Sequence, residues 1–139
     1  MKVIYLAATS SLGPASRYRI YQFRKYFERE EIKLKILPAL TDRWLEAERG
    51  TGLSRHVRRF KAGIHGLVRR IQQLATLDSH DLLIVERELF PKLPGFIEKT
   101  LLSSVHSYGV ELDDAIYLSP GRTTKYPAFL RGSAFVIAG

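Results

Sequence analysis

Short apolar runs alternate with longer segments of helical periodicity along this chain, and this alternation restricts the fold more than any single motif does. The runs that predict strands cover residues 2–8, 32–37, 81–85, 110–112 and 134–138. The segments between them carry apolar residues at three- and four-residue steps, which is typical of helices. Strands that alternate with helices pair in parallel through right-handed crossovers. The sequence therefore predicts an α/β fold, a Rossmann-like three-layer sandwich with a mainly parallel sheet.

Two of the expected elements have features of their own. Residues 17–30 are predicted to form one helix that begins after Ser16 as its N-cap. Residues 32–37 alternate apolar residues with Lys33 and Lys35, which predicts a strand with one solvated side near an edge of the sheet. Shorter helices are expected at 96–107 and 125–131, and a loop at 119–124.

The size and composition of the chain are those of one ordinary globular domain, residues 1–139. It is 45% hydrophobic and 26% charged, and no apolar stretch approaches the roughly 20 residues that span a bilayer. The absence of cysteine excludes disulfides and fits a reducing cytoplasm. The last strand reaches Gly139 without a helix to follow it, so the sequence is interpreted as a fragment of a longer protein.

Acidic residues follow two of the predicted strands, at the edge of the sheet where α/β proteins bind their ligands. The first group is Glu86-Arg87-Glu88, in which extended backbone would put Glu86 and Glu88 on one side of the strand. An internal ion pair or a helix-cap arrangement at the strand end is the structural alternative for this group. The second group is Asp113-Asp114, of which one is expected to face the crevice while the other braces a loop. A metal site is the less favoured interpretation, because the four histidines are scattered.

A loop of small residues follows the first strand and contains Gly13-Pro14. Together with Ser16, Arg17 and Arg19 at the start of the next helix, it could bind an anion such as a diphosphate. A simple turn with solvated arginines is the alternative, because neither of the common glycine-rich nucleotide motifs is complete.

A basic segment gives the chain much of its net charge of +8. Between Arg49 and Leu77 there are seven arginine and lysine residues and no carboxylate, and apolar residues from Leu53 to Leu74 recur at alternating steps of four and three. This pattern predicts a long amphipathic helix, with a bend or close packing at Gly63 and Gly66. A solvated face, docking on anionic lipid and nucleic-acid binding are the possible roles. Nucleic acid is least favoured, since Phe60 is the segment's one aromatic residue.

The chain resembles the amino-terminal, acceptor-side domain of family 4 type glycosyltransferases with the GT-B fold. The likeness lies in residues 13–19, 86–91, 112–117 and 134–139, and the Asp-Asp-Ala-Ile stretch from Asp113 is its most specific part. Many relatives have a His-Asp pair after the fourth strand, and Asp113 stands here in the place of that histidine.

The resemblance implies a two-domain enzyme whose donor-binding carboxyl-terminal domain is absent from this chain, so that the fragment is expected to be inactive alone. The whole enzyme would be a retaining transferase that moves a sugar from a nucleotide diphosphate sugar, such as a UDP- or GDP-sugar, to an acceptor hydroxyl, without a cofactor. The implied catalytic residues are Glu86, Asp113 and Asp114. The implied substrate-binding residues are Gly13, Pro14, Ser16, Arg17, Arg19, Arg87 and Glu88.

The resemblance and the basic segment together predict a cytoplasmic protein that is peripheral at the inner face of the membrane, where residues 53–74 meet anionic lipid. The main rival is a non-catalytic α/β module that binds anionic membrane or nucleic acid through the basic helix. A smaller rival is a complete α/β enzyme that uses its carboxylates with Mg²⁺.

Overall fold

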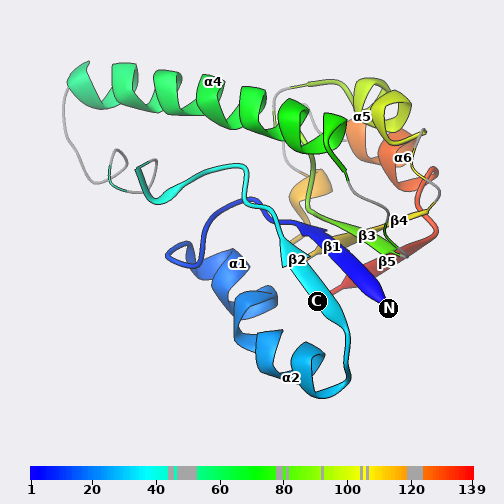
Figure 1. Ribbon diagram of the computed structural model, residues 1–139. Coiled ribbons are helices and arrows are strands. Elements are labelled where there is room, and N and C mark those ends of the chain that lie inside the picture. The colour runs from blue at the N-terminus through cyan, green and yellow to red at the C-terminus, as the bar shows by residue number, and fades with distance from the viewer. Residues whose placement is uncertain are drawn as a thin grey trace.

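A sheet of five parallel strands forms the centre of the protein, as the computed structural model shows (Figure 1). The structure describes residues 1–43, 46, 53–77, 80, 82–91, 93–103, 105, 107–118 and 124–139. The strands are β1 (Lys2–Leu6), β2 (Lys33–Ile36), β3 (Leu82–Glu86), β4 (Tyr108–Leu112) and β5 (Phe135–Ala138). Their order across the sheet is β2-β1-β3-β4-β5. The predicted α/β class and the parallel pairing are confirmed.

Helices cover both faces of the sheet and complete the Rossmann-like three-layer sandwich (Figure 1). One face carries α1 (Pro14–Arg19) and α2 (Arg24–Arg29), joined by the 3₁₀ turn η1 (Tyr21–Phe23). The other carries α4 (Leu53–Ala75), α5 (Gly95–Leu102) and α6 (Lys125–Leu130); a second 3₁₀ turn, η2, spans Ile116–Leu118. None of the helices in the described ranges is both long enough and apolar enough to cross a bilayer.

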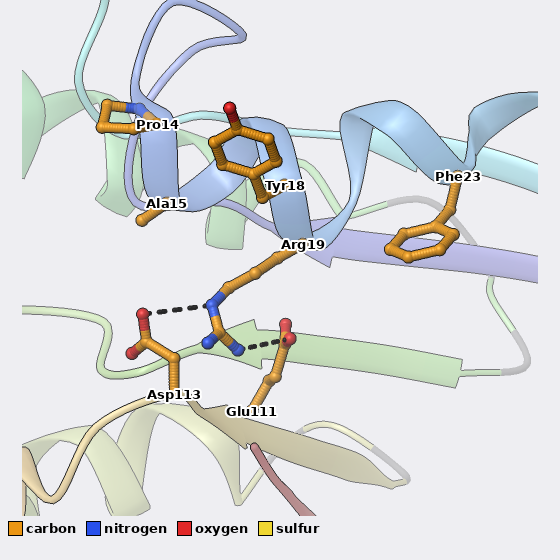
Figure 2. A pocket seen from close by; sticks show the side chains of 7 residues that line it. All are labelled: Pro14, Ala15, Tyr18, Arg19, Phe23, Glu111 and Asp113. Atoms are coloured by element: carbon orange, nitrogen blue, oxygen red, sulfur yellow. Dashed lines mark hydrogen bonds and ion pairs between the residues drawn. The ribbon is translucent and has the colours of Figure 1, made fainter.

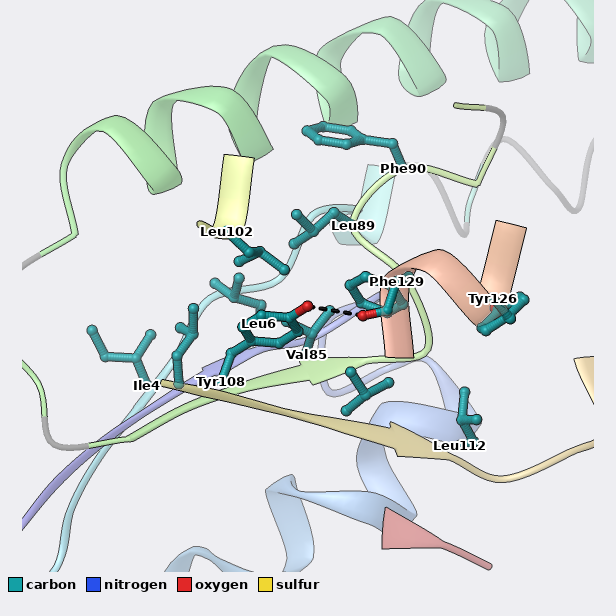
Figure 3. Packing of buried hydrophobic residues seen from close by; sticks show 12 residues of the cluster. Ile4, Leu6, Val85, Leu89, Phe90, Leu102, Tyr108, Leu112, Tyr126 and Phe129 are labelled. Atoms are coloured by element: carbon teal, nitrogen blue, oxygen red, sulfur yellow. Dashed lines mark hydrogen bonds between the residues drawn. The ribbon is translucent and has the colours of Figure 1, made fainter. Parts of the chain in front are cut away.

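The core has two parts because side chains alternate between the faces of each strand. Ile4 and Leu6 point to the face under α4, α5 and α6, where the larger cluster packs (Figure 3). Tyr108 closes this cluster through its hydroxyl, which donates to the carbonyl of Phe129 at 2.8 Å. Val3 and Tyr5 point to the opposite face and pack with Ile20 in the smaller cluster.

The single helix predicted for residues 17–30 is wrong in its start and its continuity. The helix begins at Pro14, whose fixed φ suits the first helical position, and Gly13 is the N-cap. Ser16 is therefore not the N-cap but lies inside α1, fully buried. The chain breaks at Ile20, where φ is −128°, and resumes as η1 and α2. This break lets Ile20 turn into the smaller core cluster.

Other boundaries differ by a few residues. The structure confirms β2 as an edge strand with Lys33 and Lys35 exposed, the long helix α4, and close packing at Gly66, where a Cβ would lie 2.7 Å from Leu40. Gly63 faces open space. The helix predicted for 96–107 ends at Leu102, where the hydroxyl of Ser103 donates to a carbonyl of the last turn. Residues 119–123 of the predicted loop lie outside the described residues.

The strand order positions a crevice at the carboxyl ends of β1 and β3. After β1 the chain moves outward to β2, and it then crosses back to β3 on the other side of β1. The segments that leave β1 and β3 therefore diverge, and ligands of open α/β sheets bind where this happens.

Candidate functional site

A pocket of about 430 Å³ lies between α1 and the carboxyl end of β4 (Figure 2). The residues that line it are Pro14, Ala15, Tyr18, Arg19, Phe23, Glu111 and Asp113. The volume is within the range of small-molecule sites, and the lining combines aromatic rings with three charged groups.

Arg19 links the two carboxylates of the pocket. The last turn of α1 directs its guanidinium across the pocket toward β4 (Figure 2). Its Nη1 lies 2.8 Å from Glu111 Oε1, and its Nε lies 3.1 Å from Asp113 Oδ2. The guanidinium is partly exposed, so a ligand can reach the bonded group from solvent.

Arg87 holds the same aspartate from the carboxyl end of β3. Its Nε donates to Asp113 Oδ1 at 2.8 Å, its Nη2 donates to Oδ2, and Asp114 Oδ2 lies 3.5 Å from Nη2. Asp113 is thus paired with two guanidiniums, one of them bidentate. Asp114 is 70% exposed.

The backbone at Arg87 is strained. Its φ is +62°, a conformation that favours glycine, and the N–H of Glu88 donates to the carbonyl of Glu86 at 2.8 Å. This hydrogen bond makes a γ-turn with Arg87 at its centre. The N–H of Arg87 donates to the carbonyl of Glu111 at 2.8 Å, which fixes the turn to β4. Strain of this kind is found most often at functional sites.

The γ-turn separates Glu86 from Glu88, so the prediction that they share one side is wrong. Extended backbone would have kept them together, but the positive φ of Arg87 reverses the chain between them. Glu88 is buried with Lys125 and Glu98, and Lys125 Nζ lies 2.6 Å from a carboxylate oxygen of each. Burial raises the pKa of Glu98 despite this pairing. The internal ion pair, the structural alternative for this motif, is confirmed for Glu88.

Glu86 is fully buried beneath the loop that follows β1. Its carboxylate accepts the N–H of Ala8 at 3.0 Å and the hydroxyl of Ser16 at 2.8 Å. Burial raises the pKa of Glu86, the nearby charge of Glu111 adds to the rise, and the two hydrogen bonds oppose it. Glu86 therefore attaches the loop and α1 to the sheet and does not line the pocket.

The packing of the loop after β1 explains why Gly13 and Pro14 occupy their positions. A Cβ on Gly13 would collide with the side chain of Thr9, whose N–H lies 3.1 Å from Ser16 Oγ. Pro14 follows and lines the pocket. Arg17 is exposed beside Tyr18, with its guanidinium carbon 4.8 Å from the centre of that ring.

The structure thus divides the residues predicted for the site into three groups. Pro14, Arg19 and Asp113 line the pocket, and Arg87 and Asp114 adjoin it through ion pairs. Gly13, Ser16 and Glu86 support the loop behind it. Arg17 is on the surface of α1, and Glu88 belongs to the buried ion group.

Five further residues belong to the site and were not predicted: Tyr5, Ala15, Tyr18, Phe23 and Glu111. The hydroxyl of Tyr5 donates to Glu111 from the middle of the sheet. Burial raises the pKa of Tyr5, and the charges of Glu86 and Glu111 raise it further, so this tyrosine stays a neutral donor. A signal was present in the sequence, because a glutamate inside a short buried strand requires a partner.

No family model matches the chain, and no curated protein matches it significantly. In the described part of the chain, no three histidine, aspartate or glutamate residues are grouped so that they could hold a metal ion.

Proposed function

We propose that this chain is the acceptor-side domain of a retaining glycosyltransferase that uses a nucleotide diphosphate sugar. The observation that carries the proposal is the pocket at the carboxyl end of β4, where arginine-bridged carboxylates meet the rings of Tyr18 and Phe23. Sugars present adjacent hydroxyls, which bind carboxylates and guanidiniums, and apolar C–H faces, which pack on aromatic rings. The lining supplies both kinds of contact.

In this proposal Asp113 orients an acceptor hydroxyl. Two guanidiniums hold its carboxylate in one position, and a fixed acceptor of hydrogen bonds aligns a hydroxyl better than a mobile one does. Glu111, held by Tyr5 and Arg19, takes a second hydroxyl. Glu86 is a positioning residue, because its carboxylate accepts hydrogen bonds from Ala8 in the loop and from Ser16 in α1 and does not line the pocket.

The arginines have a second role in the complete enzyme. Negative charge develops on the diphosphate as it leaves the sugar, and preorganised cations near that charge lower the barrier. Arg19 and Arg87 lie at the crevice edge and carry partly exposed guanidiniums. A donor-binding domain that closed over this edge would exclude water from the reaction.

The test is carbohydrate binding by the chain itself. We expect isothermal titration calorimetry or ligand-observed NMR with a panel of methyl glycosides to detect binding. The affinity should be about tenfold lower in Asp113→Asn. Glu30→Gln removes one negative charge from an exposed site on the far end of α2 and is the matched control.

Two results would contradict the proposal. One is a chain that binds no glycoside of the panel, and the other is an Asp113→Asn variant that binds them as tightly as the control does. A stabilisation by Mg²⁺ alone, measured as a shift in Tm, would favour the rival carboxylate–metal enzyme instead.

A further inference from the structure

The helix α4 carries its apolar residues on the outside of the protein. Six of them are between 37% and 70% exposed: Val57, Phe60, Ile64, Leu67, Val68 and Ile71. Their spacing of three and four residues puts them on one face. A surface helix normally buries such a stripe against the core. In Figure 1 α4 runs along the outside of the molecule, and its amino-terminal half extends beyond the strands.

The opposite face of α4 is anchored to the sheet by polar bonds. Arg70 is 1% exposed, and its guanidinium donates to the carbonyl of Ala7 at 2.6 Å and to that of Leu37 at 3.0 Å. Gln73 donates to the carbonyl of Pro38 at 3.0 Å.

Gly66, on the same inward face, is buried against Leu40, where a Cβ would lie 2.7 Å from a methyl of that side chain. These contacts fix the rotation of the helix about its own axis. Turning the apolar stripe inward would break them and leave the carbonyls of Ala7 and Leu37 without the Arg70 donors.

The border of the apolar stripe is basic. Arg58, Lys61 and Arg69 are exposed and lie together along one side of it, at steps of three and eight residues. The sequence has no aspartate or glutamate anywhere from Arg49 to Leu77. The outer surface of α4 is therefore an apolar strip beside a purely cationic one.

We propose that α4 is an interfacial helix that docks this surface on an anionic lipid bilayer. Phe60, Ile64 and Ile71 would enter the boundary between headgroups and acyl chains, and the basic border would meet the lipid phosphates. The occupant follows from charge complementarity, because a lipid surface supplies both the apolar phase and the negative charge that the helix lacks. This proposal is independent of the sugar site.

A second copy of the chain suits the charge less well. The alternating steps of three and four also favour a coiled coil, but such pairs use acidic residues beside the seam to neutralise basic ones. Two copies of α4 would bring two cationic borders together with no carboxylate on either helix. A nucleic acid would neutralise the charge but would leave the apolar stripe in water.

Docking would also hold the crevice at a fixed position. The carbonyls that Arg70 binds follow β1 and β2 directly, at the carboxyl edge of the sheet. A bilayer under α4 would therefore set the distance between that edge and the lipid headgroups.

The experiment is flotation of the chain with vesicles of phosphatidylcholine alone and with added phosphatidylglycerol. We expect binding to the anionic vesicles only, and binding that falls as the salt concentration rises. Arg69→Ala is expected to lower the partition coefficient about fivefold. Phe60→Ser is expected to lower it about tenfold or more.

Matched controls separate docking from general effects of the substitutions. Phe96 is 63% exposed on α5 and Phe60 is 70% exposed on α4, so Phe96→Ser removes a similar ring elsewhere. Arg131→Ala removes an exposed arginine after α6. Both controls should bind vesicles as the unmodified chain does, and an unchanged Tm in all four variants shows that the fold is intact.

Four outcomes would overturn the proposal. The first is no binding to anionic vesicles, and the second is equal loss in Phe60→Ser and Phe96→Ser. The third is a dimer, seen by light scattering without lipid, that Phe60→Ser dissociates. The fourth is binding of an oligonucleotide in preference to the vesicles.

Discussion

Two charged clusters of the protein contain neighbouring residues, Arg87 and Glu88, but lie in different environments. Arg87 points to the pocket, where it joins Asp113, Arg19 and Glu111 in a group that solvent reaches. Glu88, the next residue, points to the other side and is sealed with Lys125 and Glu98. The two clusters therefore contain similar ion pairs but differ in how far their side chains are buried.

The energetic consequences differ for the same reason. The two charges of a buried ion pair are desolvated, and removal of one partner leaves a buried charge without compensation. A partly exposed pair gains less, because water screens it, but its groups can exchange a protein partner for a ligand. We therefore assign the sealed cluster to folding and the open cluster to binding.

The largest expected effect tests the sealed cluster. Lys125→Met removes the cation that Glu88 and Glu98 share and should lower the free energy of unfolding by about 3 to 5 kcal/mol. Urea denaturation measures it. Adding Glu98→Gln to this variant should restore part of the lost stability. If the free energy of unfolding of Lys125→Met alone were within about 1 kcal/mol of that of the unmodified protein, the assignment of the sealed cluster to folding would be refuted.

The next effect tests the open cluster. Arg19→Ala should lower the free energy of unfolding by only about 1 kcal/mol while weakening glycoside binding about tenfold. Arg24→Ala, at an exposed position on α2, is the control for loss of a positive charge. If Arg19→Ala destabilised the protein as much as Lys125→Met, the two clusters would not differ as we describe.

A smaller effect concerns the γ-turn that divides the clusters. Arg87→Gly and Arg87→Ala both remove the guanidinium, but only glycine adopts a φ of +62° without strain. Thermal or urea unfolding should find the glycine variant about 1 kcal/mol more stable than the alanine variant. Equal stabilities would mean that the turn relaxes easily and does not force the two glutamates apart.

The smallest effect is a change in pH dependence at Glu86, which lies between the clusters. Burial raises its pKa above the ordinary value of 4.5, so its contribution to stability is complete below that pH and is lost as the pH rises through the folded-state pKa. Glu86→Gln keeps an acceptor for Ala8 but cannot ionise. The variant should gain stability relative to the unmodified protein as the pH rises above 4.5. A difference in the free energy of unfolding that stays constant across several pH values would argue against this expectation.

Much of the fold follows from the sequence because its signals are local. Apolar runs and periodicity predict the parallel sheet, the edge position of β2 and the length of α4. The break of the first helix at Ile20 was not predictable in this way, since it depends on how that side chain enters the core.

The site was predicted less completely, because it depends on contacts between distant residues. The acidic strand ends located the right edge of the sheet, but nothing in the residue types at Glu86, Arg87 and Glu88 indicates a positive φ. The pairing of Tyr5 with Glu111 joins β1 to β4 across β3. Likewise, periodicity reveals the stripe on α4 but not its outward direction, which the bonds of Arg70 decide.

The most direct measurement of the central claim is an NMR titration of the chain, labelled at arginine and aromatic side chains, with the glycosides that it binds. We predict that the signals of Arg19, Tyr18 and Phe23 shift together along one binding curve, while those of Tyr126 and Phe129, beside the sealed cluster, stay in place. Shifts confined to other parts of the protein, or none at saturating glycoside, would contradict it.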